Sequence, residues 1–267
     1  MGSLNGRYRI SGEQMAKKRF PFGIKTLLKI GVLITLGLGL LVVLFWLGMT
    51  FWYAKKNPES TAMIELRIEE AKAEKKTLKI QRHFVPLGAI SPNLKKAVLV
   101  AEDGAFYSHH GIDIYEIKEA AKLDWERGKL DHGASTITQQ LTRNLYLSPK
   151  KSFLRKGLEV PLALMVDAVL SKDRIFELYL NYIEWGNGIF GCEAAARAYY
   201  KKSCSDLNLD QAIRLASIII NPRRYSPDSS TERILKLRFA IAERLVNAGY
   251  VTAADARAAG YAVEAKK

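Results

Sequence analysis

The sequence predicts a mainly helical protein that carries a single N-terminal transmembrane helix. Residues 30–53 contain no charged side chain. Beyond them, apolar residues recur at helical spacing while strand-like alternation is scarce, and no long glycine/serine linker or internal repeat interrupts the chain. A chain of 267 residues allows one ordinary catalytic domain with an appendage, or two small domains, but not a large multidomain enzyme, and 48% hydrophobic residues exclude a disordered protein.

The uncharged run is long enough to cross a membrane. As a helix, 30–53 would measure about 36 Å, against a hydrocarbon core of about 30 Å. Trp46, Trp52 and Tyr53 lie toward its far end, where aromatic rings settle at the membrane interface. A cleaved signal peptide would be shorter and would end in small residues, and a core helix would rarely lack polar residues for so long. We therefore predict a transmembrane anchor over residues 30–54.

The distribution of charged residues predicts the membrane topology, and the net charge indicates which classes of partner the protein would bind. Residues 1–29 hold seven Lys or Arg and one acid, so the positive-inside rule predicts a cytoplasmic N-terminus with the rest of the chain across the membrane. The net charge of +14 favours polyanions, and this topology makes nucleic acid the least favoured of them. Cys192 and Cys204 are too few for a disulfide framework or a cysteine-based zinc site; a bond between them and two buried thiols both remain open.

Several elements are predicted from their end signals. Residues 55–80, rich in Lys, Glu and Ala, predict a solvated stem helix, with a short extended stretch over 77–85. Pro161 should kink a helix or mark its start. Further helices are expected from Ser91-Pro92, from Ser171 to near Gly186, over 209–220, over 231–248, and from a capping box of Thr252 and Asp255.

The first polar segment with chemical potential is 101–111. Glu102 and Asp103 follow an apolar run and precede a glycine, which places a carboxylate at the end of a buried helix where desolvation can tune it for proton transfer. The alternative is an acidic surface turn. His109 and His110 are adjacent, which is poor geometry for a shared metal, so we interpret them as hydrogen-bonded loop residues.

The second segment, 133–144, is a row of uncharged donors and acceptors. It suits recognition of hydroxyls, acetamides or phosphate oxygens, because such a row is costly to bury without partners. The alternative is a helix with Ser135 or Thr136 as N-cap, whose Gln and Asn face water. The two roles are compatible.

The third segment, 150–159, is basic. From Lys129 to Lys156 there are six Lys or Arg and one acid, a composition that fits a cleft for phosphate or pyrophosphate. Arg155, Lys156 and Glu159 would share one helix face. The alternative is a solvated helix with an intrahelical ion pair.

Together these segments resemble the peptidoglycan glycosyltransferase family that polymerises lipid II, and more closely its monofunctional, membrane-anchored transglycosylases of Gram-negative bacteria. From the length of 267 residues we expect no transpeptidase domain. The similarity rests on motifs in family-like order: Phe84-Val85-Pro86-Leu87, Glu102-Asp103-x-x-Phe106-x-x-His109-x-Gly111, Gly133-x-Ser135-Thr136-Ile137-Thr138-Gln139-Gln140, Arg155-Lys156-x-x-Glu159, Ser171-Lys172-x-x-Ile175-x-x-Leu178-Tyr179-Leu180-Asn181, and Trp185-Gly186-x-Gly188-Ile189-x-Gly191.

The chain departs modestly from the family pattern. Asp167 stands where Glu is common, Gln211 replaces a usual Glu, and Arg143 stands where Lys is frequent. The resemblance implies a lysozyme-like, all-helical glycosyltransferase domain over 81–228, with 229–267 forming C-terminal helices that pack on it or trail it.

The resemblance also implies an inverting transfer. The donor would be the growing glycan on undecaprenyl pyrophosphate, and the acceptor the GlcNAc 4-hydroxyl of lipid II. Glu102 would be the general base and Glu159 the second catalytic glutamate, which would orient cations or help hold a divalent ion such as Mg²⁺; no organic cofactor is expected. The implied substrate-binding residues are Asp103, Phe106, Ser135, Thr136, Gln139, Gln140, Arg143, Asn144, Lys151, Arg155 and Lys156.

The expected location is the bacterial inner membrane, with a periplasmic catalytic domain. Partners would be lipid II, the glycan chain and other cell-wall synthesis or division proteins, not nucleic acid. One rival is a lysozyme-like hydrolase or lytic transglycosylase, which has no pyrophosphate to stabilise and little need for the basic segment. The other is a non-catalytic membrane-anchored scaffold, whose function should survive loss of Glu102.

Overall fold

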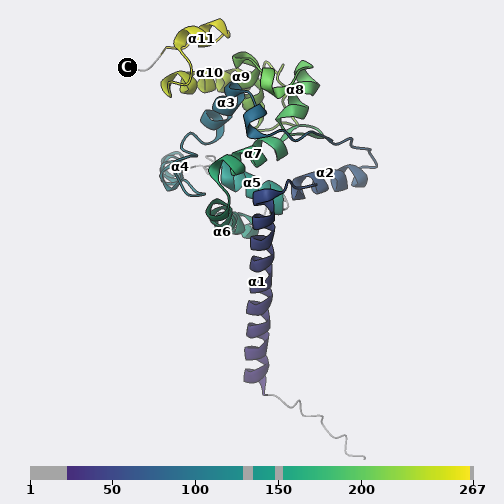
Figure 1. Ribbon diagram of the computed structural model, residues 1–267. Coiled ribbons are helices and arrows are strands. Elements are labelled where there is room, and N and C mark those ends of the chain that lie inside the picture. The colour runs from purple at the N-terminus through teal and green to yellow at the C-terminus, as the bar shows by residue number, and fades with distance from the viewer. Residues whose placement is uncertain (1–22, 129–134, 148–152, 265–267) are drawn as a thin grey trace, which may run out of the picture. The chain divides into compact units, whose positions relative to one another are not determined.

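The computed structural model describes residues 23–128, 135–147 and 153–264. The chain divides into two compact units, Met1–Phe45 and Trp46–Lys267. Almost every element in the described residues is a helix, which confirms the predicted fold class (Figure 1).

The first unit consists, in its described residues, of the greater part of helix α1 (Ile24–Lys55). Within the segment Lys25–Lys55, an 18-residue window has a mean hydropathy of 2.7, and its side chains are exposed, such as Leu33 at 67%. It is long and apolar enough to cross a membrane and is compatible with a single-pass anchor. The last turns of α1 belong to the second unit, where the Thr50 hydroxyl lies 2.9 Å from that of Tyr146.

The second unit is a set of short helices with one small sheet. The α-helices are α2 (Ala62–Ala73), α3 (Pro92–Glu102), α4 (Ile114–Arg127), α5 (Ile137–Tyr146), α6 (Phe153–Val169), α7 (Lys172–Tyr182), α8 (Cys192–Tyr200), α9 (Leu209–Ile218), α10 (Glu232–Asn247) and α11 (Ala253–Ala258). Two 3-10 turns cover Leu87–Ala89 and Cys204–Asp206. Strands β1 (Gln81–Arg82) and β2 (Glu184–Gly186) flank β3 (Ile189–Phe190), parallel and antiparallel to it.

The core forms where apolar helix faces meet. Helix α5 packs against α6 and α7, and α3 packs against α9 and α10. Leu94, Ala97 and Val98 of α3 are fully buried, as the helical spacing of apolar residues in this segment predicts. This packing fixes the C-terminal end of α3, and with it Glu102, beside the start of α5.

The stem differs from its prediction. The helix covers only Ala62–Ala73 because Thr61 caps its start by accepting from the Ile64 amide, and Lys75, with a φ of 56°, follows its end. It is also not solvated on all sides: Leu66 is buried, and Arg67 donates to Glu184 at 2.8 Å. Residues 55–80 therefore hold the last residue of α1 and a short helix that packs on the rest of the unit, with non-helical segments on both sides of that short helix.

Most other predicted ends are confirmed. Helices begin at Pro92 and after Ser171, and the capping box of Thr252 and Asp255 is present. Helix α7 ends at Tyr182, earlier than predicted, because the next residues pair with β3. Pro161 lies inside α6, so it does not mark a helix start.

The two cysteines are buried, unbonded thiols in the structure. Cys192 begins α8 and Cys204 begins the second 3-10 turn, and their Sγ atoms lie 3.5 Å apart. Helix α10, the larger of the C-terminal helices, packs on α3 and α9 rather than trailing the domain.

Candidate active site

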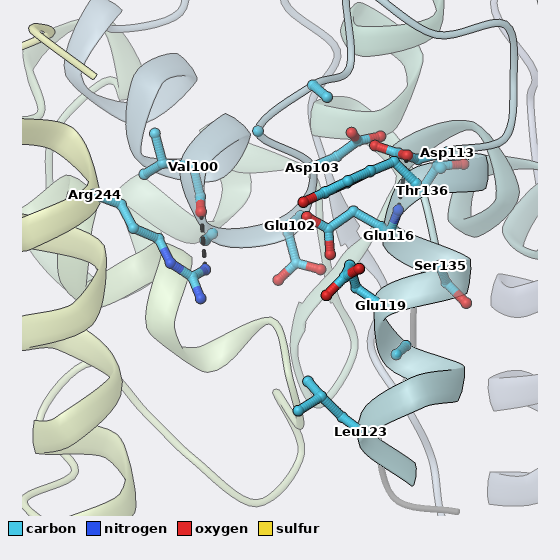
Figure 2. A pocket seen from close by; sticks show the side chains of 15 residues that line it. Val100, Glu102, Asp103, Asp113, Glu116, Glu119, Leu123, Ser135, Thr136 and Arg244 are labelled. Atoms are coloured by element: carbon cyan, nitrogen blue, oxygen red, sulfur yellow. Dashed lines mark hydrogen bonds between the residues drawn. The ribbon is translucent and has the colours of Figure 1, made fainter. Parts of the chain in front are cut away.

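A cavity of about 760 Å³ opens beside the C-terminal end of α3 (Figure 2). Its walls come from three helices and the loops that join them. Residues 100–105 form one wall, α4 with Asp113 forms a second, and Ser135 and Thr136 stand at the start of α5. Arg244 of α10 completes the lining. Glu102, the predicted base, faces this hollow.

The environment of Glu102 suits a general base. Its Oε2 atom accepts from Gln140 Nε2 at 2.8 Å. Burial raises the pKa of Glu102, and the neighbouring charge of Asp103 acts in the same direction. The Gln140 donor and the charges of Arg143 and Arg244 oppose this rise in pKa. The Glu102 carboxyl group is thus held in place by the Gln140 amide, while its raised pKa preserves its affinity for a proton.

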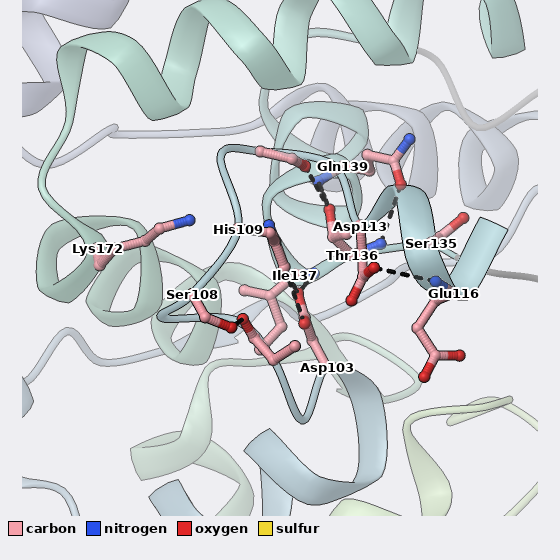
Figure 3. Close-up of polar contacts among 12 residues, drawn as sticks. Asp103, Ser108, His109, Asp113, Glu116, Ser135, Thr136, Ile137, Gln139 and Lys172 are labelled. Carbon is pink, nitrogen blue, oxygen red and sulfur yellow. Dashed lines mark hydrogen bonds and ion pairs between the residues drawn. The ribbon is translucent and has the colours of Figure 1, made fainter. Parts of the chain in front are cut away.

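Asp103 has a structural role in the cavity wall, because its carboxylate is occupied by hydrogen bonds within the protein. It is buried, its Oδ2 accepts from the Ile137 amide at 2.9 Å, and its Oδ1 lies 3.0 Å from His109 Nε2 (Figure 3). One carboxylate therefore joins the end of α3, the following loop and the start of α5. His109 is the hydrogen-bonded loop residue that the sequence predicts.

The polar row at the start of α5 divides into two groups. Thr136 caps the helix and Gln139 completes a capping box, with its Oε1 accepting from the Thr136 amide at 3.0 Å. Both are buried, so the N-cap interpretation is confirmed for Thr136. Ser135 and Gln140 are only partly buried; Gln140 donates to Glu102, and Ser135 accepts from Lys156.

Two other predicted substrate-binding residues lie away from the cavity lining. Phe106 is fully buried and packs against Phe176, with ring centroids 5.7 Å apart. Asn144 is buried and donates to the Gln140 carbonyl at 2.8 Å. Both residues therefore contribute to packing and hydrogen bonding next to the site and do not line the cavity. Lys151 lies outside the described residues.

A cationic cluster, defined by Arg143, Arg155 and Lys156, surrounds Glu159. The Glu159 side chain is 0% exposed and pairs directly with Arg155, while Lys156 Nζ lies 3.0 Å from its Oε2 and Arg143 Nη1 3.8 Å from its Oε1. Lys156 Nζ also donates to Ser135 Oγ at 3.1 Å. Because Ser135 lines the cavity, the cluster adjoins the hollow that Glu102 faces.

The surroundings of Glu159 do not fit a divalent cation. Both carboxylate oxygens are paired with cationic side chains, which would repel a metal ion. Among the described residues, no group of three or more His, Cys, Asp or Glu could hold a metal ion. Glu159 instead balances and orients the cluster.

Two residues of the site escaped sequence reasoning. Arg244 lies in α10 and donates from Nη1 to the Val100 carbonyl at 3.1 Å, near the end of α3. Tyr179 lies in α7 and donates to Gln140 Oε1 at 3.0 Å. Arg244 occupies an ordinary charged helix face and carried no distinguishing signal. Tyr179 belongs to the motif Ser171-Lys172-x-x-Ile175-x-x-Leu178-Tyr179-Leu180-Asn181, but its apolar helical spacing indicated a core residue, so it received no role at the site.

Gly111 allows the loop of the site to approach α6. Its φ is +77°, and a Cβ atom would lie 2.7 Å from the Ala163 carbonyl oxygen. The Gly111 carbonyl also accepts from Thr136 Oγ1 at 2.7 Å. The loop between α3 and α4 is therefore held against both α5 and α6.

We expect Gly111→Ala to lower the free energy of unfolding by at least about 1–2 kcal/mol, the cost of a left-handed backbone at a non-glycine residue. Thermal unfolding of the full chain measures the effect. Gly88→Ala is the matched control, because its Cβ would meet nothing within 4 Å. Equal melting temperatures for the two variants would contradict the assigned constraint.

Comparisons with known proteins agree on one family. A family model described as transglycosylase matches residues 70–246. A protein of Thiobacillus denitrificans named biosynthetic peptidoglycan transglycosylase is 47% identical over 195 residues, which cover 73% of this chain and 84% of that protein. Proteins with the same name from Aromatoleum aromaticum and Methylobacillus flagellatus are 44% and 42% identical, over 73% and 80% of this chain and 84% and 93% of their own lengths.

Proposed function

This chain belongs to the transglycosylase family, as a glycosyltransferase that acts on peptidoglycan, and from that premise we propose that it polymerises lipid II by an inverting transfer. The donor is the growing glycan on undecaprenyl pyrophosphate, and the acceptor is the GlcNAc 4-hydroxyl of lipid II. The observation that carries the proposal is the juxtaposition of Glu102 and the cationic cluster through Ser135 and Gln140.

Glu102 acts as the general base. A sugar hydroxyl is a weak nucleophile at neutral pH, so a carboxylate must take its proton as the oxygen attacks. The O4–H bond of the acceptor breaks and the proton passes to Glu102. The O4 atom forms the new bond to the anomeric carbon of the donor, and the bond to the pyrophosphate breaks with its electron pair leaving on the phosphate oxygen. Attack opposite the leaving group inverts the anomeric centre.

The cationic cluster stabilises the departing pyrophosphate. The leaving group gains negative charge in the transition state, so fixed cations lower the barrier more than they stabilise the bound substrate. Arg143 and Arg155 supply planar donors, and Lys156 supplies a point charge close to Ser135. Glu159 keeps these side chains in place.

The proposed membrane topology and location are consistent with the lipid-linked substrates of the reaction. The N-terminus is cytoplasmic, α1 crosses the bacterial inner membrane once, and the catalytic unit is periplasmic. An anchor in the bilayer that holds both lipid-tailed substrates raises their effective concentration at the site. Other cell-wall synthesis or division proteins are proposed as partners.

A divalent cation such as Mg²⁺ remains a proposal for the reaction. When bound, it would neutralise charge on the pyrophosphate. Because Glu159 is fully paired with cations, no step is assigned to a metal ion at that residue.

Labelled lipid II, followed on a gel with and without EDTA, tests the proposed function. The full chain in detergent micelles should lengthen lipid II into polymer, and the EDTA arm tests the proposed cation. Finished glycan strands are the parallel substrate. Cleavage of those strands without growth from lipid II would identify a hydrolase or lytic transglycosylase, and inertness toward both would favour a scaffold.

The ionisation of Glu102 should determine how kcat/KM depends on pH at the acid side of the profile. Because burial raises the pKa of Glu102, kcat/KM should rise with pH around a midpoint above 4.5, the ordinary value for glutamate. Arg244→Gln removes a positive charge that favours the ionised carboxylate, so the midpoint should move to higher pH. Initial polymerisation rates across pH measure both. An unchanged midpoint in Arg244→Gln would contradict the coupling of Arg244 to the base.

A further inference from the structure

We propose that Tyr179 is a positioning residue for the transfer reaction, which orients Glu102 through the amide of Gln140. This inference rests on the proposed function of Glu102 as the base. Tyr179 is not among the residues that line the cavity, and its role is to hold the Gln140 amide that in turn holds the Glu102 carboxylate.

A continuous chain of hydrogen bonds connects α7 to the base. The Tyr179 hydroxyl donates to Gln140 Oε1 at 3.0 Å, and Gln140 Nε2 donates to Glu102 Oε2 at 2.8 Å. The three residues come from α7, α5 and α3, so the chain joins three helices at the site. Donors and acceptors all run in one direction, toward the carboxylate, and such aligned bonds strengthen one another.

The orientation of the Gln140 amide is determined on both sides. Its nitrogen faces two acceptors, Glu102 Oε2 and the Ser135 carbonyl at 3.4 Å, while its oxygen faces the Tyr179 hydroxyl. A reversed amide would bring its oxygen against two oxygens. Tyr179 therefore supplies the third point that keeps the amide from rotating.

The tyrosine itself cannot move readily. Its side chain is fully buried, between the helices of the core. Burial raises the pKa of Tyr179 well above its ordinary value, so the hydroxyl keeps its proton and stays a donor. A rigid donor of this kind transmits a fixed position to a side chain that is only partly buried.

Other charged groups near Glu102 also influence its pKa, independently of the hydrogen bonds from Tyr179 through Gln140. Asp103 lies on the same helix, Arg143 comes from α5 and Arg244 from α10, and Glu116 and Glu119 of α4 line the opposite wall of the cavity. The charges of Asp103, Arg143 and Arg244 act on Glu102 through space and do not require Tyr179. Removal of the tyrosine hydroxyl alone thus isolates the hydrogen-bonded route.

The test replaces Tyr179 with phenylalanine in the full chain. We expect kcat for lipid II polymerisation to fall about tenfold with little change in KM, because the base loses its alignment and not its substrate. The acid limb of the pH profile should move up by about one pH unit, because the carboxylate loses support for its charged form. Tyr199→Phe is the matched control, since it removes a tyrosine hydroxyl that donates to the Trp185 carbonyl, at 3.0 Å, and not to the Gln140 amide.

A spectroscopic titration separates this inference from the proposed function. Carbon NMR of labelled glutamate, assigned with Glu102→Gln, should show a higher titration midpoint for Glu102 in Tyr179→Phe whether or not lipid II is the substrate. A raised midpoint with no polymerisation by the unmodified chain would leave the positioning role standing and overturn the proposed function. An unmoved midpoint together with unchanged kcat would overturn the positioning role.

Gln140→Met provides a second test of whether Tyr179 positions Glu102 through Gln140. It breaks the chain at its middle, so it should raise the Glu102 midpoint even if Tyr179→Phe does not fold. If Tyr179 acts through Gln140, the double variant should lose no more kcat than Gln140→Met alone. Additive losses would mean that Tyr179 acts by another path.

Discussion

The Glu102→Gln protein is expected to fold normally and to make no measurable glycan polymer from lipid II. General-base catalysis contributes about 100- to 10,000-fold to rates, and an amide cannot take the proton of the acceptor hydroxyl. The cavity keeps its shape, because glutamine has the same size and can still bond to Gln140. Labelled lipid II and a gel of the products measure the loss.

Stability should not fall with this substitution. The pKa of Glu102 is raised in the fold, so the folded state holds the proton more tightly than the unfolded state. The stabilisation from that proton is complete below the unfolded pKa and is lost as pH rises through the folded pKa. At neutral pH the buried charge is therefore a cost, and glutamine removes it.

The matched control is Glu119→Gln. Glu119 also lines the cavity, so the substitution changes the charge of the hollow by the same amount without touching the proposed base. It should retain most of the polymerisation rate. Unreduced turnover by a folded Glu102→Gln protein would remove Glu102 as the base.

Glu159→Gln should lower activity about 100-fold or more, through the cationic cluster rather than through proton transfer. The glutamate is enclosed, and its loss leaves Arg155 and Lys156 without their common partner. Those side chains would then splay away from the pyrophosphate. We also expect the free energy of unfolding to fall by about 2 kcal/mol, less than for a fully enclosed ion pair, because the Lys156 side chain stays 53% exposed.

Polymerisation kinetics and thermal unfolding separate the two effects of Glu159. Glu232→Gln is the control, because it breaks an exposed pair with Lys236 within one helix and should change neither measurement. A mild loss of activity in Glu159→Gln would reduce the residue to a structural ion pair.

The sequence was sufficient to predict the parts of the site that depend on local order. Glu102 could be placed at the end of a buried helix from the apolar run before it, and an N-cap could be placed at Ser135 or Thr136, of which the structure selects Thr136. Arg155, Lys156 and Glu159 share a helix face by periodicity alone. Each of these inferences needs only the geometry of one helix.

The remaining parts depend on contacts between distant segments. Gln139 was expected to reach substrate, but it bonds to its own helix start, because the capping box satisfies a backbone amide that is otherwise unpaired. Phe106 sits in a signature motif and yet is core, because Phe176 of α7 packs on it. Tyr179 belongs to a family-like motif, but the motif does not show that α7 reaches the base, and Arg244 lies on an ordinary charged helix face.

The position of Arg244 has a practical consequence for recombinant fragments. A fragment cut after residue 228 would keep every signature motif, yet it would remove Arg244 from the cavity lining and expose the face of α3 that α10 covers. It would also remove the Arg238 guanidinium, which is buried and donates to the Pro227 carbonyl at 2.7 Å. Soluble versions for inhibitor screening should therefore retain the chain at least through residue 247, or they will present compounds with a different cavity.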